Sequence, residues 1–224
     1  MATILNLETA TTNCSVSIGR DGAVVALMEE NTPNYSHSEQ LHVFIAAVLK
    51  KARLDFSDLD AIAVSKGPGS YTGLRIGVSA AKGLCFSLDL PLISIATLKS
   101  MAHQITASEK TIIIPVLDAR RMEVYSCVFN TAHEELRETK AEIIGNDSFK
   151  EFLAYDKVHL VGSGAEKCKG IVKSPKFDFQ TEIIPSANEM TKLSYEKFKV
   201  GDFEDVAYFE PYYLKDFVLQ SKKS

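Results

Sequence analysis

One segment restricts the fold of this chain more than any other: Lys66 to Gly77, with the sequence KGPGSYTGLRIG. A turn of glycine and proline leads directly into small residues at helical spacing. Backbone N–H groups at such a helix start can bind an anion. Two interpretations stay open, an anion-binding loop or a strand-to-helix turn capped by Ser70. The absence of the GxxxxGK[ST] spacing of a P-loop favours the capped turn.

Composition limits the classes of protein that this chain can belong to. With 224 residues, 46% of them hydrophobic and 24% charged, it can bury one large core or two small ones. A net charge of −4 argues against a protein that by itself wraps nucleic acid. The opening MATILNLETA lacks a basic, apolar leader, and no stretch reaches the ~20 apolar residues of a membrane span, which predicts a cytoplasmic protein. The lysines at 222 and 223 are expected to form a solvated tail.

A pattern of strands occurs twice in the sequence. Apolar or alternating runs at 4–7, 14–18 and 23–28 predict a three-stranded meander, and similar runs follow at 112–117, 123–129 and 136–144. In each copy an acidic residue, Glu8 or Asp118, follows the first strand. We interpret the two runs as an internal duplication of one supersecondary unit.

The segments between and after these strands complete an α/β pattern. Helices are predicted at 36–52, where Ser36 and Glu39 form a capping box, at 70–87, from 97, and at 187–199. Short apolar strands are predicted at 60–65, 92–95 and 157–161. This order favours two lobes of the ribonuclease H or actin type, at 1–105 and 106–224, with the second lobe reduced.

Few residues in the sequence indicate chemistry. Phosphoryl transfer by an actin-fold ATPase or a small-molecule kinase, the rival function, would use Glu8 and Asp118 to hold a metal. The turn after Glu8 contains no glycine, which hinders close approach of the backbone to a phosphate. The candidates for weak nucleotide contact are Glu8, Thr9, Asp118, Gly162 and Gly164.

Metal sites and covalent catalysis find little support in the residue pattern. His37 and His42 are five apart, which places them roughly 140° from each other on a helix, so they are not expected to hold one ion. The four cysteines are scattered and are predicted to be reduced core thiols. The chain has no GxSxG motif. We therefore predict no catalytic residue and no metal ligand.

Two helices carry more apolar or small surface than one lobe needs. Residues 43–49, VFIAAVL, leave the first helix without a polar face. The second helix has one stripe of Leu74, Val78, Ala81 and Cys85, and another of Ile76, Ser79, Ala80, Gly83 and Ser87. Small stripes allow tight packing inside the chain or an intermolecular four-helix arrangement, and the pattern does not decide which stripe faces out.

Several motifs together resemble one family. The segment GPGSYTGLRIG is similar to the GPGS[FY]TGLRIG signature of the TsaB (YeaZ) family. Weaker similarities are ILNLETATTNCSVSI at 4–18, HSEQL at 37–41, PVLDARRMEVYSCVF at 115–129 and the closing PYYLK at 211–215. The usual Asp-Thr-Ser of the opening is replaced here by Glu8, Thr9 and Ala10. The resemblance covers nearly the whole chain.

The resemblance implies both a fold and a role. Members have two lobes of the sugar kinase, heat-shock and actin superfamily. They act as the non-catalytic subunit beside TsaD, which modifies adenosine 37 of tRNAs that read ANN codons to N6-threonylcarbamoyladenosine. The small ATPase TsaE joins the complex, and tRNA is bound only through it. TsaD holds its ion with an HxxxH pair, which this sequence lacks. No activity is expected of the chain alone.

The same resemblance implies where the partner binds. TsaB-like chains pair with TsaD, or with themselves as homodimers, through the two helices at 36–52 and 70–87. The resemblance implies that no cofactor is required by this chain, and it allows ATP or ADP at the junction with the partner. The interface candidates are Glu39, His42, Val43, Ala46, Ala47, Lys50, Thr72, Arg75, Ile76, Ser79, Ala80, Gly83 and Ser87.

Overall fold

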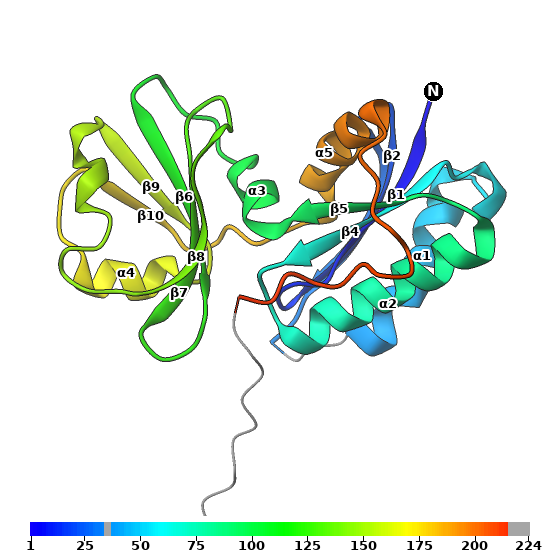
Figure 1. Ribbon diagram of the computed structural model, residues 1–224, viewed down its shortest axis with the longest axis horizontal. Helices are drawn as coiled ribbons and strands as arrows, with labels where there is room; N and C mark the ends of the chain where they lie inside the picture. Colours follow the sequence, from blue (N-terminus) through cyan, green and yellow to red (C-terminus); the bar gives the residue numbers. More distant parts are fainter. Residues whose placement is uncertain (34–36, 215–224) are drawn as a thin grey trace, which may run out of the picture.

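A computed structural model of the chain describes residues 1–33 and 37–214. It consists of two lobes, each built around a five-stranded sheet (Figure 1). The predicted cap Ser36, Lys215 of the closing motif and the lysines at 222 and 223 lie outside the described residues. None of the helices in the described part has the length and apolar content needed to cross a bilayer.

The first sheet has the strand order β3-β2-β1-β4-β5. Its meander of β1 (Thr3–Glu8), β2 (Asn13–Arg20) and β3 (Ala23–Asn31) is antiparallel. β4 (Ala61–Gly67) then pairs parallel to β1, and β5 (Leu92–Ala96) pairs parallel to β4. The strands predicted from the sequence in this lobe are confirmed.

The second sheet repeats this topology, with the order β10-β9-β6-β7-β8. β6 (Thr111–Asp118), β7 (Glu123–Phe129) and β8 (Glu135–Ile143) form the meander, and β9 (Lys157–Val161) and β10 (Phe177–Gln180) are parallel to β6. The predicted duplication is confirmed, as is the ribonuclease H or actin type of fold. The second lobe has as many strands as the first but shorter helices. Its α4 (Ala165–Ile171) has seven residues, whereas α2 (Tyr71–Leu88) of the first lobe has 18.

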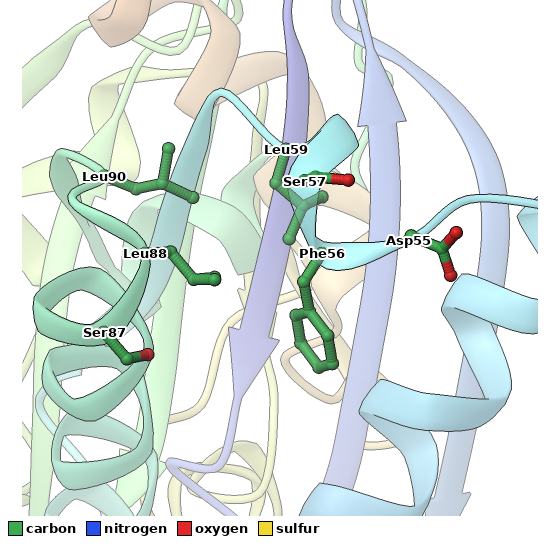
Figure 2. A pocket seen from close by; sticks show the side chains of 7 residues that line it. All are labelled: Asp55, Phe56, Ser57, Leu59, Ser87, Leu88 and Leu90. Carbon is green, nitrogen blue, oxygen red and sulfur yellow. The ribbon is translucent and has the colours of Figure 1, made fainter.

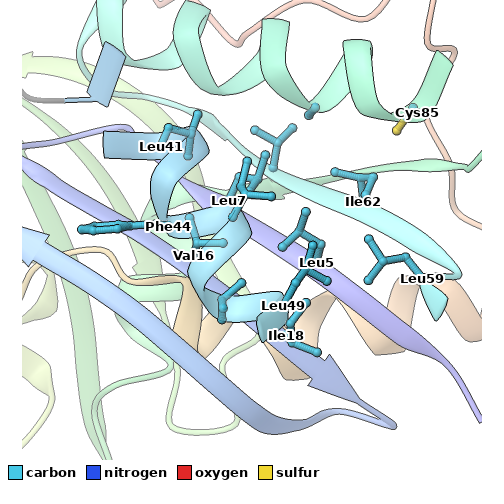
Figure 3. Packing of buried hydrophobic residues seen from close by; sticks show 14 of the residues in the cluster. Leu5, Leu7, Val16, Ile18, Leu41, Phe44, Leu49, Leu59, Ile62 and Cys85 are labelled. Atoms are coloured by element: carbon cyan, nitrogen blue, oxygen red, sulfur yellow. The ribbon is translucent and has the colours of Figure 1, made fainter. Parts of the chain in front are cut away.

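Helices cover both faces of the first sheet. α1 (His37–Ala52) and α2 pack on one face, and the short turn η1 (Phe56–Asp58) connects α1 to β4. Leu41, Phe44, Ile45, Val48 and Leu49 of α1 are buried and face the strands. Figure 3 shows Leu41, Phe44 and Leu49 packed over Leu5, Leu7 and Val16 of the sheet. α3 (Thr97–Ala102) lies between the two lobes (Figure 1).

The other face of the first sheet is covered by a helix from the end of the chain. α5 (Ala187–Val200) packs its Ala187, Met190 and Leu193 against β1, β4 and β5. Ser194 Oγ donates to Asn6 Oδ1 at 2.6 Å. The chain thus returns to the first lobe after the second, whereas the prediction from the sequence assigned all of 106–224 to the second lobe. The short η2 (Lys150–Ala154), α4 and β10 were not predicted either.

Candidate partner-binding surface

The outer faces of α1 and α2 form the candidate surface, and within the described residues most of the side chains predicted for it reach solvent. Val43 on α1 has 57% of its surface exposed. The exposed members are Glu39, His42, Val43, Ala46, Lys50, Thr72, Arg75, Ser79, Gly83 and Ser87, and the half-buried ones are Ala47, Ile76 and Ala80. None of the 13 candidates is buried, so both helices present these residues outward.

α2 separates its two stripes between the core and the solvent. Leu74, Val78, Ala81 and Cys85 are buried against the sheet. Of the small-residue stripe, Ser79, Gly83 and Ser87 are exposed, whereas Ile76 and Ala80 are half-buried and pack partly against the same core. A Cβ atom added at Gly83 would meet no atom within 4 Å, apart from the neighbouring helix backbone. Gly83 therefore leaves room for close approach by another molecule rather than for packing within this chain.

Phe86 belongs to the same surface and was not among the residues predicted from the sequence. Its side chain is 87% exposed, the largest exposed fraction of any phenylalanine in the described residues. It follows Gly83 by three positions and Ser79 by seven, the spacing of one helix face. The stripe read from the sequence already reached Ser87, and including the i+3 neighbour of Gly83 would have found Phe86. A large apolar ring held in water is a suitable anchor for a protein partner.

An open hollow of about 720 Å³ continues this surface at the C-terminal end of α2. Figure 2 shows its lining, with Ser87, Leu88 and Leu90 on one side and the η1 residues Phe56 and Ser57 on the other. Phe56 is itself 39% exposed. Apolar surface is thus accessible from the middle of α2 to its last residue.

Residues 202–214 run beside α2 as an extended strap (Figure 1). Lys82 Nζ donates to the carbonyls of Ala207 at 3.1 Å and Phe209 at 3.0 Å. Tyr212 N donates to Lys66 O at 2.7 Å, which ties the strap to the start of the glycine and proline turn. The strap fixes one flank of α2 and leaves the outer stripe uncovered.

The glycine and proline turn serves the fold of this chain. Ser70 accepts from Gly73 N at 3.3 Å and caps α2, as one of the two interpretations required. Its own N–H donates to Ala10 O at 2.7 Å. Gly73 and Gly77 lie against Thr9, since an added Cβ would fall 2.2 Å from Thr9 O and 2.3 Å from Thr9 Oγ1 respectively. The turn therefore locks the β1–β2 connection onto the start of α2.

Glu8 and Thr9 are structural members of that connection. Glu8 is fully buried, and its Oε1 accepts from Ala10 N at 2.6 Å. Burial raises the pKa of Glu8 to about 7, although hydrogen bonds from Ala10, Ser65 and Thr9 act in the opposite direction. Thr9 Oγ1 donates to Gly73 O at 2.8 Å. Both side chains are enclosed by the chain, and Glu8 Oε2 has no hydrogen-bond partner among the described residues.

Asp118, Gly162 and Gly164 lie together at one end of the second sheet. The exposed Asp118 pairs with Lys167 at 2.6 Å, and its N–H donates to Ser163 Oγ at 3.1 Å. Gly162 has a φ of +110°, and a Cβ there would fall 2.6 Å from Val116 O. Gly164 N donates to that same carbonyl at 3.0 Å. These glycines let the loop after β9 pack closely on β6.

Within residues 1–33 and 37–214 no group of three or more His, Cys, Asp or Glu side chains is arranged to hold a metal ion. The four cysteines are buried and unbridged, as the spacing predicted. His37 is buried, with Nε2 2.6 Å from Thr11 O, whereas His42 points to solvent. The predicted separation of these two histidines on α1 is confirmed.

Comparisons with known proteins match the chain to two related groups, both named for threonylcarbamoyladenosine in tRNA. A family model described as "TsaD: tRNA N6-adenosine threonylcarbamoyltransferase" matches residues 32–211. The chain is 28% identical to the tRNA threonylcarbamoyladenosine biosynthesis protein TsaB of Escherichia coli, over 98% of this chain and 97% of that protein. It is 30% identical to the TsaB of Buchnera aphidicola subsp. Schizaphis graminum, over 84% of this chain and 90% of the relative.

Solved structures agree on the fold. A Pseudomonas aeruginosa protein described as similar to peptidase YeaZ superimposes with a TM-score of 0.82 at 24% identity, over 96% of this chain and 100% of that one. A structure described as YeaZ from the same organism gives a TM-score of 0.80 with the same coverage and identity. Both have the two-lobed arrangement described above.

Proposed function

This chain belongs to the TsaB (YeaZ) family of tRNA threonylcarbamoyladenosine biosynthesis proteins, and from that premise we propose that it is the non-catalytic subunit that holds TsaD through the outer faces of α1 and α2. The observation that carries the proposal is apolar and small surface that this chain leaves open. Phe86 and Val43 are 87% and 57% exposed, and Gly83 has free space above it. Burial of such surface is the main favourable term in protein association.

The two helices have the shape of a helix-pairing surface. Small residues at Ser79, Ala80 and Gly83 allow a partner helix to approach the α2 backbone closely, and Phe86 supplies an aromatic anchor beside them. A homodimer of the isolated chain would use the same faces and would compete with TsaD. In this proposal TsaE and tRNA bind the assembled complex, and any ATP or ADP lodges at the junction with TsaD rather than at the enclosed Glu8.

A charge placed on the open stripe tests the proposal. We expect Gly83→Glu to abolish co-elution of the chain with TsaD in size-exclusion chromatography, because a buried, unpaired carboxylate opposes association. The matched control is Gly170→Glu on α4, another exposed helical glycine with nothing within 4 Å of an added Cβ. Thermal melting checks that both variants remain folded.

The same preparation tests the absence of catalysis. We expect no threonylcarbamoyl transfer to tRNA by the purified chain alone, and transfer once TsaD, TsaE and the threonylcarbamoyl adenylate are added. The Gly83→Glu variant should fail to support that reaction, whereas Gly170→Glu should support it. Turnover by the chain without TsaD, or unimpaired association of Gly83→Glu, would refute the proposal.

A further inference from the structure

Four basic side chains from separate segments meet where the two lobes join. Lys99 lies on α3, His103 directly after it, His133 in the turn between β7 and β8, and Lys192 on α5. The imidazole rings of His103 and His133 stack with centroids 4.1 Å apart and planes 21° from parallel. α3 and α5 are in contact, and both lysines are close enough for their charges to act on His103. The cluster therefore combines groups from both lobes.

Neither Lys99 nor Lys192 forms an ion pair with any residue in 1–33 or 37–214. His103 Nε2 is shielded from solvent and has no hydrogen-bond partner among the described residues. Burial lowers the pKa of His103 to about 4, with further lowering by the charges of His133, Lys99 and Lys192. The local field is thus positive although the chain carries a net charge of −4.

The cluster is separate from the residues expected to contact a nucleotide. Asp118 precedes β7 (Glu123–Phe129) and His133 follows it, so the two lie at opposite ends of that strand. Glu8, in the first lobe, is enclosed by its own turn. Both lysines are exposed, which makes the cluster a surface feature that a large ligand can reach.

We propose that Lys99, Lys192 and the stacked His103–His133 pair bind a phosphate group of the RNA backbone. The two ammonium groups supply the contacts and release counterions from the RNA, as lysines at phosphates do. A bound anion offsets the positive charges of the two lysines, which add to burial in lowering the pKa of His103, so binding raises that pKa. The RNA assignment rests on the proposed function, in which the assembled complex receives tRNA.

The first experiment measures the site in the isolated chain. The imidazole signals of His103 are followed by NMR from well below pH 4 up to pH 8, in inorganic phosphate and in chloride of equal ionic strength. We expect phosphate to raise the pKa of His103 by about one unit, because it offsets nearby positive charge. The double variant Lys99→Gln, Lys192→Gln should lose this response.

The second experiment measures RNA binding by the complex with TsaD, after assembly has been verified by size-exclusion chromatography. We expect the double variant to bind unmodified tRNA about tenfold more weakly at physiological salt, with a salt dependence reduced by about one unit of log–log slope for each lysine. The control is Lys169→Gln, Lys173→Gln, which removes the same charge from exposed lysines of the second lobe, on and just after α4. It should leave the affinity unchanged.

The outcomes separate this proposal from the preceding one. If no complex assembles, the proposed function fails, and the same tRNA is then titrated against the isolated chain with both double variants. Equal tRNA affinity of the parent and the Lys99, Lys192 variant overturns the proposal. This result overturns the proposal even if inorganic phosphate raises the pKa of His103, because the site then binds a free anion rather than RNA.

Discussion

At the scale of single residues, the connection between β1 and β2 shows how a catalytic-looking carboxylate can serve the fold. The sequence made Glu8 a candidate metal ligand of an actin-fold ATPase, yet it is fully buried and accepts a hydrogen bond from Ala10 N at 2.6 Å. Thr9 beside it is bonded to Gly73 O. Burial of a carboxylate disfavours its charged form, so Glu8 couples the stability of this turn to pH.

We predict that Glu8→Gln removes a pH-dependent cost from folding. Since the folded pKa of about 7 exceeds the unfolded value of 4.5, the folded state binds the proton more tightly. The stabilisation of the folded state by protonated Glu8 is complete below pH 4.5 and is lost as the pH rises through 7. Relative to the parent, Glu8→Gln should gain up to about 3 kcal/mol in the free energy of unfolding between pH 4.5 and 8. Urea unfolding at a series of pH values measures this gain.

The control for this change is Glu138→Gln, which replaces an exposed glutamate on β8. Its unfolding free energy should follow that of the parent at each pH. A Glu8→Gln variant that also runs parallel to the parent across this range would show that Glu8 titrates in the folded protein as it does in the unfolded chain.

At the scale of elements, α2 uses the same residue type for two opposite purposes. Gly77 faces the β1–β2 connection, where an added Cβ would lie 2.3 Å from Thr9 Oγ1. Gly83 faces solvent, with no atom within 4 Å of an added Cβ. The sequence pattern shows two glycines six positions apart on one helix, and only the neighbouring elements distinguish the internal contact from the open one.

We predict that alanine at these two positions changes stability in opposite directions. Gly77→Ala should lower the free energy of unfolding by about 1–3 kcal/mol, because the methyl group displaces the buried Thr9. Gly83→Ala should raise it by up to about 1 kcal/mol, because alanine favours a helix over glycine and meets no obstacle. Chemical denaturation of both variants at one protein concentration provides the test. Destabilisation by Gly83→Ala would mean that the outer stripe is packed within the chain.

At the scale of the whole molecule, the first lobe is completed by the end of the chain. α5 crosses back from the second lobe and buries Met190 and Leu193 against Ile4 and Ile93. The strap that follows it adds Val206 and Phe209 to the core beneath α2. Both faces of the first sheet are therefore covered only when residues from both ends of the sequence are present.

We predict that a fragment of residues 1–105 does not fold on its own. Without α5 it exposes one apolar face of its sheet, and this exposed apolar surface opposes folding and favours aggregation. Far-UV circular dichroism during urea titration should show no cooperative transition. A chain ending at residue 214 is the control and should unfold cooperatively. A monomeric fragment 1–105 with a sharp transition would contradict the assignment of α5 to this lobe's core.

Local patterns were sufficient for the elements and for the composition of the partner surface. The alternation of apolar residues predicted the strands of both meanders, and the stripes on α2 follow from helical geometry alone. Ser70 as a cap was also one of two interpretations that the glycine and proline turn allowed. These features depend on residues close together in the sequence, which is why the sequence contains them. Short elements such as α4 and β10 have too few residues for a periodic signal.

Tertiary structure decided what depends on contacts between distant residues. The sequence by itself determined two duplicated lobes, a family signature and two helices with surplus apolar or small surface. Only the folded chain places the small stripe of α2 outside, encloses Glu8, brings His103 onto His133 and returns α5 to the first sheet. The physical reason is that burial and electrostatic environment are set by whichever segments pack together, and in this chain those segments are distant from one another in the sequence.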